Sequence, residues 1–164
     1  MLLLYKYENK KLSLDINEHN LEEFLEDIAI ENRTILQTHE IQLDITCDPR
    51  LTGYFDDNLV RSVLNSAINN SQRYTRDQIL LSAEDREDFI VLRVEDNGDG
   101  FPDDMLEAQA VNGTSNRIDQ GSTQLGLYFA NLIARIHINR DNQGFIRFEN
   151  RVNLSGGCFS LWLP

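Results

Sequence analysis

The chain has 164 residues and 41% of them are hydrophobic, a length and composition that suit one globular domain with its own core. The formal net charge of −12 argues against nucleic acid and against direct contact with a membrane, because phosphate-rich surfaces require lysine and arginine on the binding face. The two cysteines lack the spacing of a metal site, which favours reduced thiols in a cytoplasmic protein.

The first half of the chain predicts two amphipathic helices. Apolar residues recur at helical spacing over residues 21–29 and again over residues 59–68. Asn20 is the expected cap of the first helix, and either Asp56 or Asp57 is the expected cap of the second, because these side chains can accept a free backbone N–H.

Between these helices the sequence predicts one strand. Residues 41–47 alternate apolar and polar side chains, as a half-buried strand does, and Pro49 and Gly53 are expected to end it. Residues 1–17 are mixed and amphipathic without a clear period. They look like the tail of a longer segment.

The second half of the chain is rich in strands. Residues 103–124 are polar and aperiodic, and a loop of that length in a compact domain is usually functional, often a lid. A helix is expected over residues 125–137. Strands are expected at residues 78–83, 88–95, 144–150 and 158–163. This order predicts an α+β fold, a two-layer sandwich with helices on one face of a mixed or antiparallel sheet.

Three polar residues near the end of the second predicted helix can contact a nucleotide. Asn70 and Arg73 are three positions apart and share a helix face. The Asn70 carbonyl suits Mg²⁺ already bound to a triphosphate, because it adds a hard oxygen ligand without further negative charge. Arg73 can bind phosphate oxygens, and Tyr74 can line a base or ribose pocket. Taken alone, a solvated helix end is the commoner explanation.

A second motif, Asp96 to Pro102, follows directly after a predicted strand. Gly98 and Gly100 permit a tight turn and the close approach of a ligand to the backbone. The Asp96 carboxylate can accept a hydrogen bond from the exocyclic amine of adenine, whereas guanine would present an oxygen there. The alternative is an ordinary Asp-Gly turn, which the length of the match disfavours.

A third segment leads into the last predicted helix and could hold phosphate. Free amides and the positive end of the helix dipole favour an anion at such a position. Before it, Arg117 is the one basic residue of the predicted lid. The candidate contacts in the segment are Thr123, Leu125, Gly126 and Leu127.

The order and spacing of these motifs resemble the Bergerat-fold ATPases, and most closely the catalytic domain of sensor histidine kinases. The family's Asn box, N-A-x-K-Y-T, is similar to residues 70–75. Its first glycine box, D-x-G-x-G-[IF]-P, matches residues 96–102, and its second, G-x-G-L-G-L, matches residues 124–127 except at Gln124. The family's C-terminal pattern is similar to residues 156–164.

The resemblance covers nearly the whole chain and implies its domain organisation. Residues 1–15 would be the tail of a preceding dimerisation helix hairpin. Residues 16–164 would be the ATP-binding catalytic domain with the Bergerat fold.

The resemblance also implies an ATP-dependent protein histidine kinase whose cofactors are ATP and Mg²⁺. Asp96 would read adenine, and Asn70 would hold Mg²⁺. Arg73 and the amides near Gly126 would hold phosphates, and Arg117 could reach the γ-phosphate.

The implied partners follow from what the chain lacks. His19, His39 and His137 do not stand in the family's acceptor pattern, so no catalytic residue is assigned to this chain. The acceptor is expected on the dimerisation helix hairpin of the same or another kinase chain, and a response regulator is expected downstream. The domain would be cytoplasmic, within a full-length protein that could be membrane-anchored.

The chain departs from the family pattern at four places. Gln124 replaces a glycine, and a positive φ there would cost roughly 1–3 kcal/mol. Ser66 stands where the family often has an earlier Asn, Gly157 replaces a Thr, and no Phe-rich box lies between Pro102 and Gly121. The alternative function is therefore a degenerate domain with weak or no nucleotide binding that acts through protein contacts. A serine kinase of the anti-sigma-factor type is disfavoured by the hairpin-like N-terminus.

Overall fold

A five-stranded mixed sheet forms the centre of the molecule. The computed structural model describes the backbone of residues 13–112 and 122–164, and their side chains except at 108, 110–112 and 122–125. The strand order is β2-β4-β5-β9-β8; β2 pairs with β4 in parallel, and the other neighbours are antiparallel. These strands are β2 (Gln42–Thr46), β4 (Gln78–Arg86), β5 (Phe89–Asp96), β8 (Phe145–Asn150) and β9 (Gly157–Leu163).

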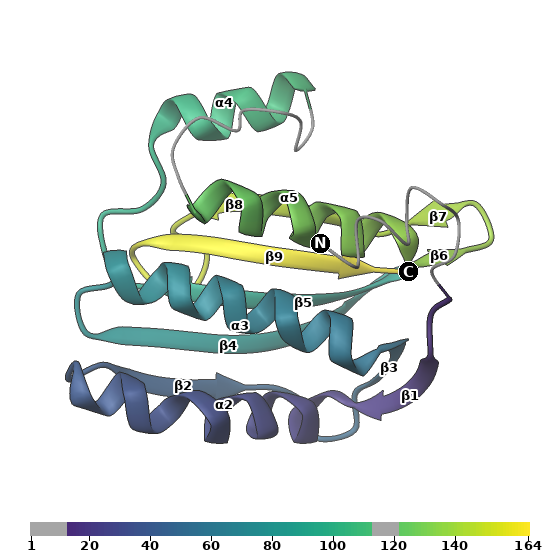
Figure 1. Cartoon of the computed structure of the whole chain (residues 1–164), viewed down its shortest axis with the longest axis horizontal. Coiled ribbons are helices and arrows are strands. Elements are labelled where there is room, and N and C mark those ends of the chain that lie inside the picture. The colour runs from purple at the N-terminus through teal and green to yellow at the C-terminus, as the bar shows by residue number, and fades with distance from the viewer. Residues whose placement is uncertain (1–12, 113–121) are drawn as a thin grey trace.

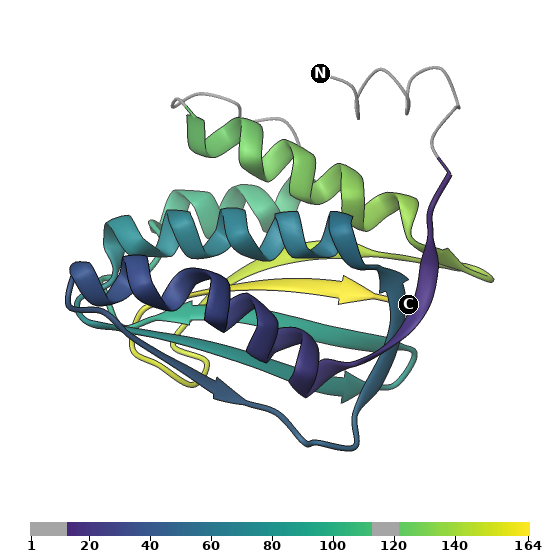
Figure 2. The same cartoon turned by 60° about the horizontal axis from the view of Figure 1, so that its bottom comes forward.

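Three long helices cover one face of this sheet (Figures 1 and 2). They are α2 (Leu21–Thr38), α3 (Asp57–Tyr74) and α5 (Ser122–Ile136), and a shorter helix, α4 (Asp103–Asn112), contacts the edge strand β8. Within the described residues, no helix is both long and apolar enough to cross a membrane. The predicted two-layer α+β sandwich with helices on one face is confirmed.

The core lies between the sheet and the three long helices. Every second residue of the central strands points toward the helices. Leu92 of β5 lies beside its register partner Leu161 of β9, Leu81 of β4 lies beside Val94 of β5, and the three leucines are fully buried. The facing side of α3 contributes Val60 and Leu64, which are also fully buried. Each such side chain stabilises the fold by about 1.5–3 kcal/mol through apolar burial.

The two predicted helix caps are present. The Asn20 side chain accepts the Glu23 N–H at 3.0 Å and begins α2. Of the two candidates for the second cap, the structure selects Asp56, whose Oδ1 accepts the Leu59 N–H at 3.1 Å. Asp57 is instead the first residue of α3.

Two short pairs of strands were not predicted. β1 (Ile16–Asn20) pairs antiparallel with β3 (Thr52–Asp56), so Gly53 lies inside a strand instead of ending one. The polar sequence of β1 has no alternation, and its partner is more than thirty residues away, so tertiary pairing decides its conformation. A second small ribbon joins β6 (Ile138–Asn139) to β7 (Asn142–Gln143).

The prediction of an aperiodic loop over residues 103–124 was wrong at both ends, because residues 103–112 form α4 and α5 begins at Ser122. α4 follows Pro102, whose carbonyl oxygen accepts the Met105 N–H at 3.1 Å. Asp103 and Asp104 lie in the first turn, where the helix dipole favours negative charge. The helix has no clear apolar stripe, which explains why periodicity did not reveal it. Residues 113–121 lie outside the described part of the chain.

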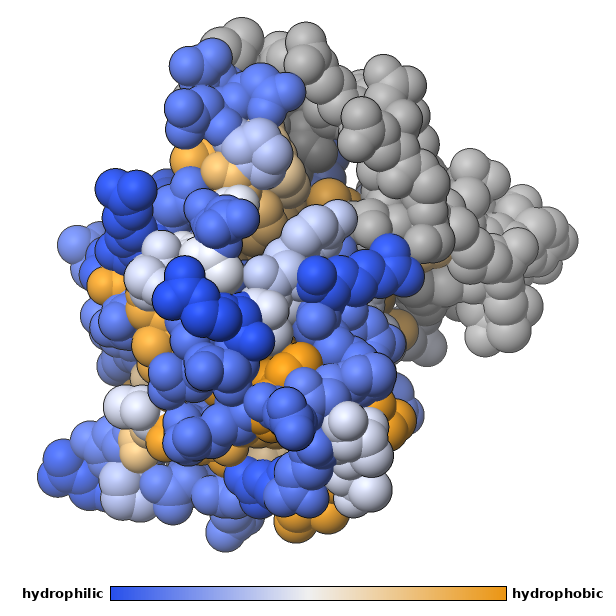
Figure 3. Space-filling model, turned by 90° about the vertical axis from the view of Figure 1, so that its left-hand side faces the viewer, coloured by the Kyte–Doolittle hydropathy of each residue, from blue (hydrophilic) through white to orange (hydrophobic). Residues whose placement is uncertain are grey.

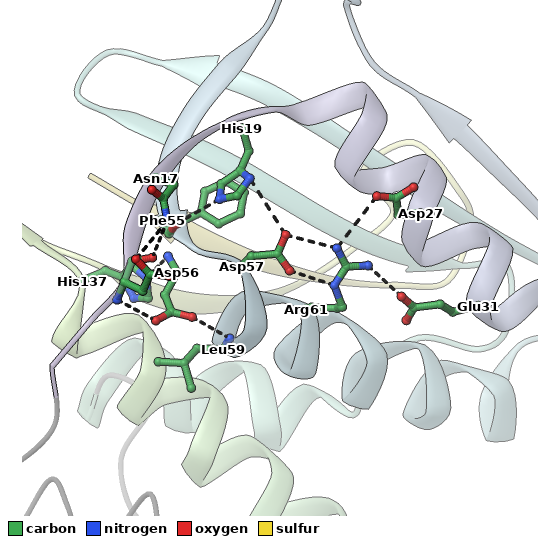
Figure 4. Close-up of polar contacts among 11 residues, drawn as sticks. Asn17, His19, Asp27, Glu31, Phe55, Asp56, Asp57, Leu59, Arg61 and His137 are labelled. Atoms are coloured by element: carbon green, nitrogen blue, oxygen red, sulfur yellow. Dashed lines mark hydrogen bonds and ion pairs between the residues drawn. The ribbon is translucent and has the colours of Figure 1, made fainter.

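A buried junction ties the first described residues to the beginning of α3 and the end of α5 (Figure 4). The Asp56 carboxylate accepts the Asp15 N–H at 2.9 Å, and the Asp56 N–H donates to His137 Nε2 at 3.2 Å. Because Nε2 accepts, the ring proton is on Nδ1, which donates to the Ile133 carbonyl at 2.7 Å. Burial lowers the pKa of His137, which keeps the ring neutral. Of the tail that was expected over residues 1–15, residues 1–12 lie outside the described part of the chain.

Candidate functional site

A cavity of about 220 Å³ lies between α3 and α5, above the β8–β9 side of the sheet. α3 lines it with Ser66, Asn70 and Arg73, and α5 with Gly126 and Leu127. Three aromatic rings complete the wall, namely those of Phe101, Phe148 and Phe159. The fold therefore brings residues from all three predicted motifs to one place.

Asn70 presents an unsatisfied oxygen in this cavity. Its Oδ1 atom is buried and has no hydrogen-bond partner within the described part of the chain. A buried amide oxygen without a partner costs about 1–3 kcal/mol, so native proteins usually supply it with a donor, a metal or a ligand. Asn70 therefore keeps an unused hydrogen-bond acceptor on a residue that lines the cavity.

Asp96 lies at the end of β5 and is held by the backbone around it. Its side chain is only 5% exposed, and Oδ1 accepts the Gly98 N–H at 2.8 Å and the Gly157 N–H at 3.4 Å. Burial raises the pKa of Asp96, and the two amide bonds oppose that shift. Asp96 is not one of the residues that line the cavity just described. It is the last residue of β5, five positions before Phe101, which does line the cavity.

The glycines of the second motif are required by close contacts. A Cβ on Gly98 would lie 2.0 Å from the Tyr74 carbonyl oxygen. Gly100 has φ +87°, a conformation that side chains disfavour, and a Cβ there would lie 2.8 Å from Asn150 Oδ1. The predicted tight turn is present, and it brings the loop against the end of α3.

Asn97 fastens this loop to the chain after α3. Its Oδ1 accepts the N–H groups of Arg76, Asp77 and Gln78 at 3.1–3.2 Å. The motif D-x-G-x-G leaves position 97 unspecified, so this role of Asn97 was not predicted. One amide oxygen that accepts three backbone N–H groups joins the first motif to the second.

The third motif has a different local structure from the one expected. α5 begins at Ser122, so residues 122–127 are helical, and the positive φ considered for Gln124 does not arise because helical φ is negative. A Cβ on Gly126 would lie 2.9 Å from the Ser66 hydroxyl, so this glycine lets α5 approach α3. Leu127 lines the cavity.

The remaining candidate residues are placed as follows. The Tyr74 side chain is 61% exposed and does not line the cavity. Arg73 lines the cavity and also a wider depression beside it, which contains His39 and Arg76. Arg117 and the side chains of Thr123 and Leu125 lie outside the described part of the structure.

The site is open toward the end of the molecule where α2 and α3 finish. Figure 3 shows that hydrophilic side chains cover most of this end and that apolar surface gathers beneath α4, the uppermost helix in the view. α4 places Met105 and Leu106 against the core.

Gly157, one of the departures from the family pattern, has a local explanation. A Cβ at this position would lie 2.9 Å from the Phe101 ring, so glycine lets that ring pack on β9. Phe148 and Phe159 were assigned only to strands in the sequence analysis. Their role in the cavity wall follows from sheet register, which sequence periodicity alone does not give.

Comparison with known proteins agrees with this geometry. Residues 55–164 match the family described as Histidine kinase-, DNA gyrase B-, and HSP90-like ATPase. The sensor histidine kinase GraS of Staphylococcus haemolyticus (strain JCSC1435) is 26% identical over 168 residues, which cover 99% of this chain and 47% of GraS. The chain thus spans about half the length of that relative.

Solved structures show the same fold. The nucleotide-free catalytic domain of histidine kinase ThkA superposes with a TM-score of 0.74 at 21% identity, covering 92% of this chain and 96% of that one. Full-length ShkA in complex with AMPPNP gives a TM-score of 0.76 at 18% identity, covering 93% of this chain and 32% of ShkA.

Proposed function

The chain belongs to the histidine kinase-, DNA gyrase B- and HSP90-like ATPase family, and from this membership we propose that it binds Mg-ATP and transfers the γ-phosphate to a histidine on a separate helix hairpin. It would be the catalytic domain of a cytoplasmic sensor kinase module. The hairpin would belong to the same or another kinase chain, and a response regulator would receive the phosphate afterwards.

The unsatisfied Asn70 oxygen is the observation that carries this proposal. Asn70 Oδ1 is buried beside Arg73 on a wall of the cavity, where a metal-bound triphosphate would supply the missing partner. Mg²⁺ bound with the nucleotide neutralises phosphate charge and orients the reacting group. Among the described residues, no group of three or more His, Cys, Asp or Glu could hold a metal ion. The metal is therefore expected to bind together with the nucleotide.

The composition of the cavity favours transfer to a protein over hydrolysis. Neither Asp nor Glu lines the described part of the cavity, and the Ser66 hydroxyl is too weak a base to activate water. Phosphoryl transfer requires positioning and charge neutralisation more than a base on the enzyme. The nucleophile can then be supplied by the partner hairpin.

The three histidines of this chain are poor candidates for the acceptor. His137 is buried and held by two backbone groups. The His19 ring stacks on Phe55 at 4.6 Å and contacts its carbonyl oxygen at 3.2 Å. His39 ends α2 at the rim of the neighbouring depression. These positions support an acceptor on another domain.

The test is transfer from γ-labelled ATP. Incubated alone with Mg-ATP, the chain should acquire no acid-labile label. With a sensor-kinase helix hairpin that carries its acceptor histidine, label should appear on the hairpin, and a hairpin whose acceptor is replaced by Gln is the control. Label on His19, His39 or His137 would contradict a separate acceptor. A chain that binds no ATP would instead support the degenerate domain.

A further inference from the structure

Two aromatic rings of the cavity wall are held by side-chain amides from outside the wall. The Gln109 amide of α4 donates through Nε2 to the Phe148 carbonyl at 2.9 Å, and its Oε1 accepts the Phe148 N–H. The Asn150 amide of β8 accepts the Phe101 N–H at 2.8 Å and donates to the Phe101 carbonyl at 3.0 Å. We call these two bidentate contacts the amide clamps.

The position of β8 explains why the Gln109 clamp is possible. β8 is the last strand of the sheet, and its partner β9 lies on one side only. The N–H and C=O of Phe148 therefore point to the open edge, where unpaired backbone groups need partners. One glutamine amide satisfies both groups, as a neighbouring strand would, and fastens α4 at that point.

The amide clamps bind the backbone of two phenylalanines whose rings touch each other. The centroids of Phe101 and Phe148 lie 5.2 Å apart with an angle of 79° between their planes, an edge-to-face contact. Phe148 continues the wall to Phe159, at 5.6 Å. Gly100 allows the second clamp, because a Cβ there would strike the Asn150 amide. A shift of either backbone segment would therefore displace the apolar wall.

We propose that Gln109 and Asn150 are positioning residues for the nucleotide, and that the amide clamps fix the Phe101–Phe148 wall against which its base packs. This rests on the proposed function, because it assigns the occupant of the cavity. Neither residue needs to touch the nucleotide. Loss of either clamp should weaken the contribution of the nucleoside to the binding free energy. The metal-dependent contribution at Asn70 should stay unchanged.

The test uses neutral variants, so that no charge is added near an anionic ligand. Gln109→Met keeps length and helix propensity but removes both hydrogen bonds, and Asn150→Leu does the same for the other clamp. Gln37→Met, at an exposed position of α2 without a described side-chain hydrogen bond, is the matched control. Calorimetric affinities for ADP in EDTA and for Mg-ATP are compared, together with amide hydrogen exchange at Phe148 and Phe101.

Each clamp variant should bind both ligands roughly fivefold more weakly, because the aromatic wall is no longer held in place before the base arrives. The ratio of the Mg-ATP affinity to the ADP affinity should be the same as in the wild type, and the clamped amide should exchange faster. The Gln37→Met chain should match the wild type throughout. A general loss of structure would speed amide exchange throughout the core and not only at Phe148 or Phe101, which separates positioning from destabilisation.

Two results would overturn the inference while leaving the proposed function intact. One is unchanged ADP affinity in both clamp variants, and the other is unchanged exchange at Phe148 and Phe101. If the wild-type chain itself binds neither ligand, the proposed function fails and the inference fails with it. Should Gln109→Met not fold, Asn150→Leu decides the question.

Discussion

Replacing Asp96 by Asn is expected to weaken ATP binding by roughly two orders of magnitude, while the fold survives. Both described hydrogen bonds of the carboxylate go to Oδ1, which accepts the Gly98 and Gly157 N–H groups, and an asparagine oxygen can keep them. Oδ2 is then the atom that can accept the adenine amine. An NH₂ group there would oppose another donor, and losing a hydrogen bond to a charged group costs about 1.5–3 kcal/mol before that repulsion is added.

The control for this variant is Asp99→Asn. Asp99 is exposed on the same loop, so the substitution makes the same change of net charge three residues away. Titration calorimetry gives the affinities and thermal melting confirms the fold. If Asp96→Asn and Asp99→Asn bind ATP equally well, the assignment of Asp96 to the base is wrong.

Gly98→Ala should damage both stability and binding. The added Cβ would lie 2.0 Å from the Tyr74 carbonyl oxygen and 3.2 Å from Asp96 Oδ1, so the loop must move away from the end of α3. Overpacking of this kind typically costs about 1–3 kcal/mol. The displaced loop also carries Asp96, so ATP binding should fall to the detection limit. Urea unfolding measures the first effect, and calorimetry measures the second.

Gly53→Ala is the matched substitution for comparison. The nearest atom to a Cβ at Gly53 is a side-chain carbon of Ile90 at 3.4 Å, an ordinary contact, and Gly53 lies inside β3. Replacing a strand glycine without strain should leave the free energy of unfolding unchanged or raise it by about 0.4–1 kcal/mol. If both alanine variants lose the same free energy of unfolding, the close approach of Gly98 to Tyr74 is not the cause of the destabilisation.

The parts of the fold that follow from local patterns were predictable from sequence. Alternating residues predicted β2 and β5 to within a few positions, and β4, β8 and β9 were also predicted. The Asn20 side chain marked the beginning of α2. β1 and β3 were missed because each depends on pairing with a distant segment. α4 was missed because its sequence has no apolar period, and its attachment at Gln109 is to a strand 39 residues away.

The candidate site divides in the same way. The motifs identified Asn70, Asp96 and the two glycines of the loop, whose chemistry can be read from residue type and spacing. The amides of Asn97, Gln109 and Asn150 could not be found, because each acts through backbone groups 19 to 49 residues away. A single Asn or Gln carries no local signal of such a contact. The backbone strain at Gln124 was overestimated for a related reason, because this residue lies in the helix α5, where φ is negative.

The most direct test of the account is a calorimetric titration of the wild-type chain with ATP in the presence and absence of Mg²⁺. We expect one nucleotide per chain, clearly tighter binding with Mg²⁺ than in EDTA, and barely measurable binding of Mg²⁺ alone, because the Asn70 oxygen is the only ligand assigned to the metal. No ATP binding under either condition, or tight Mg²⁺ binding without nucleotide, would contradict the account.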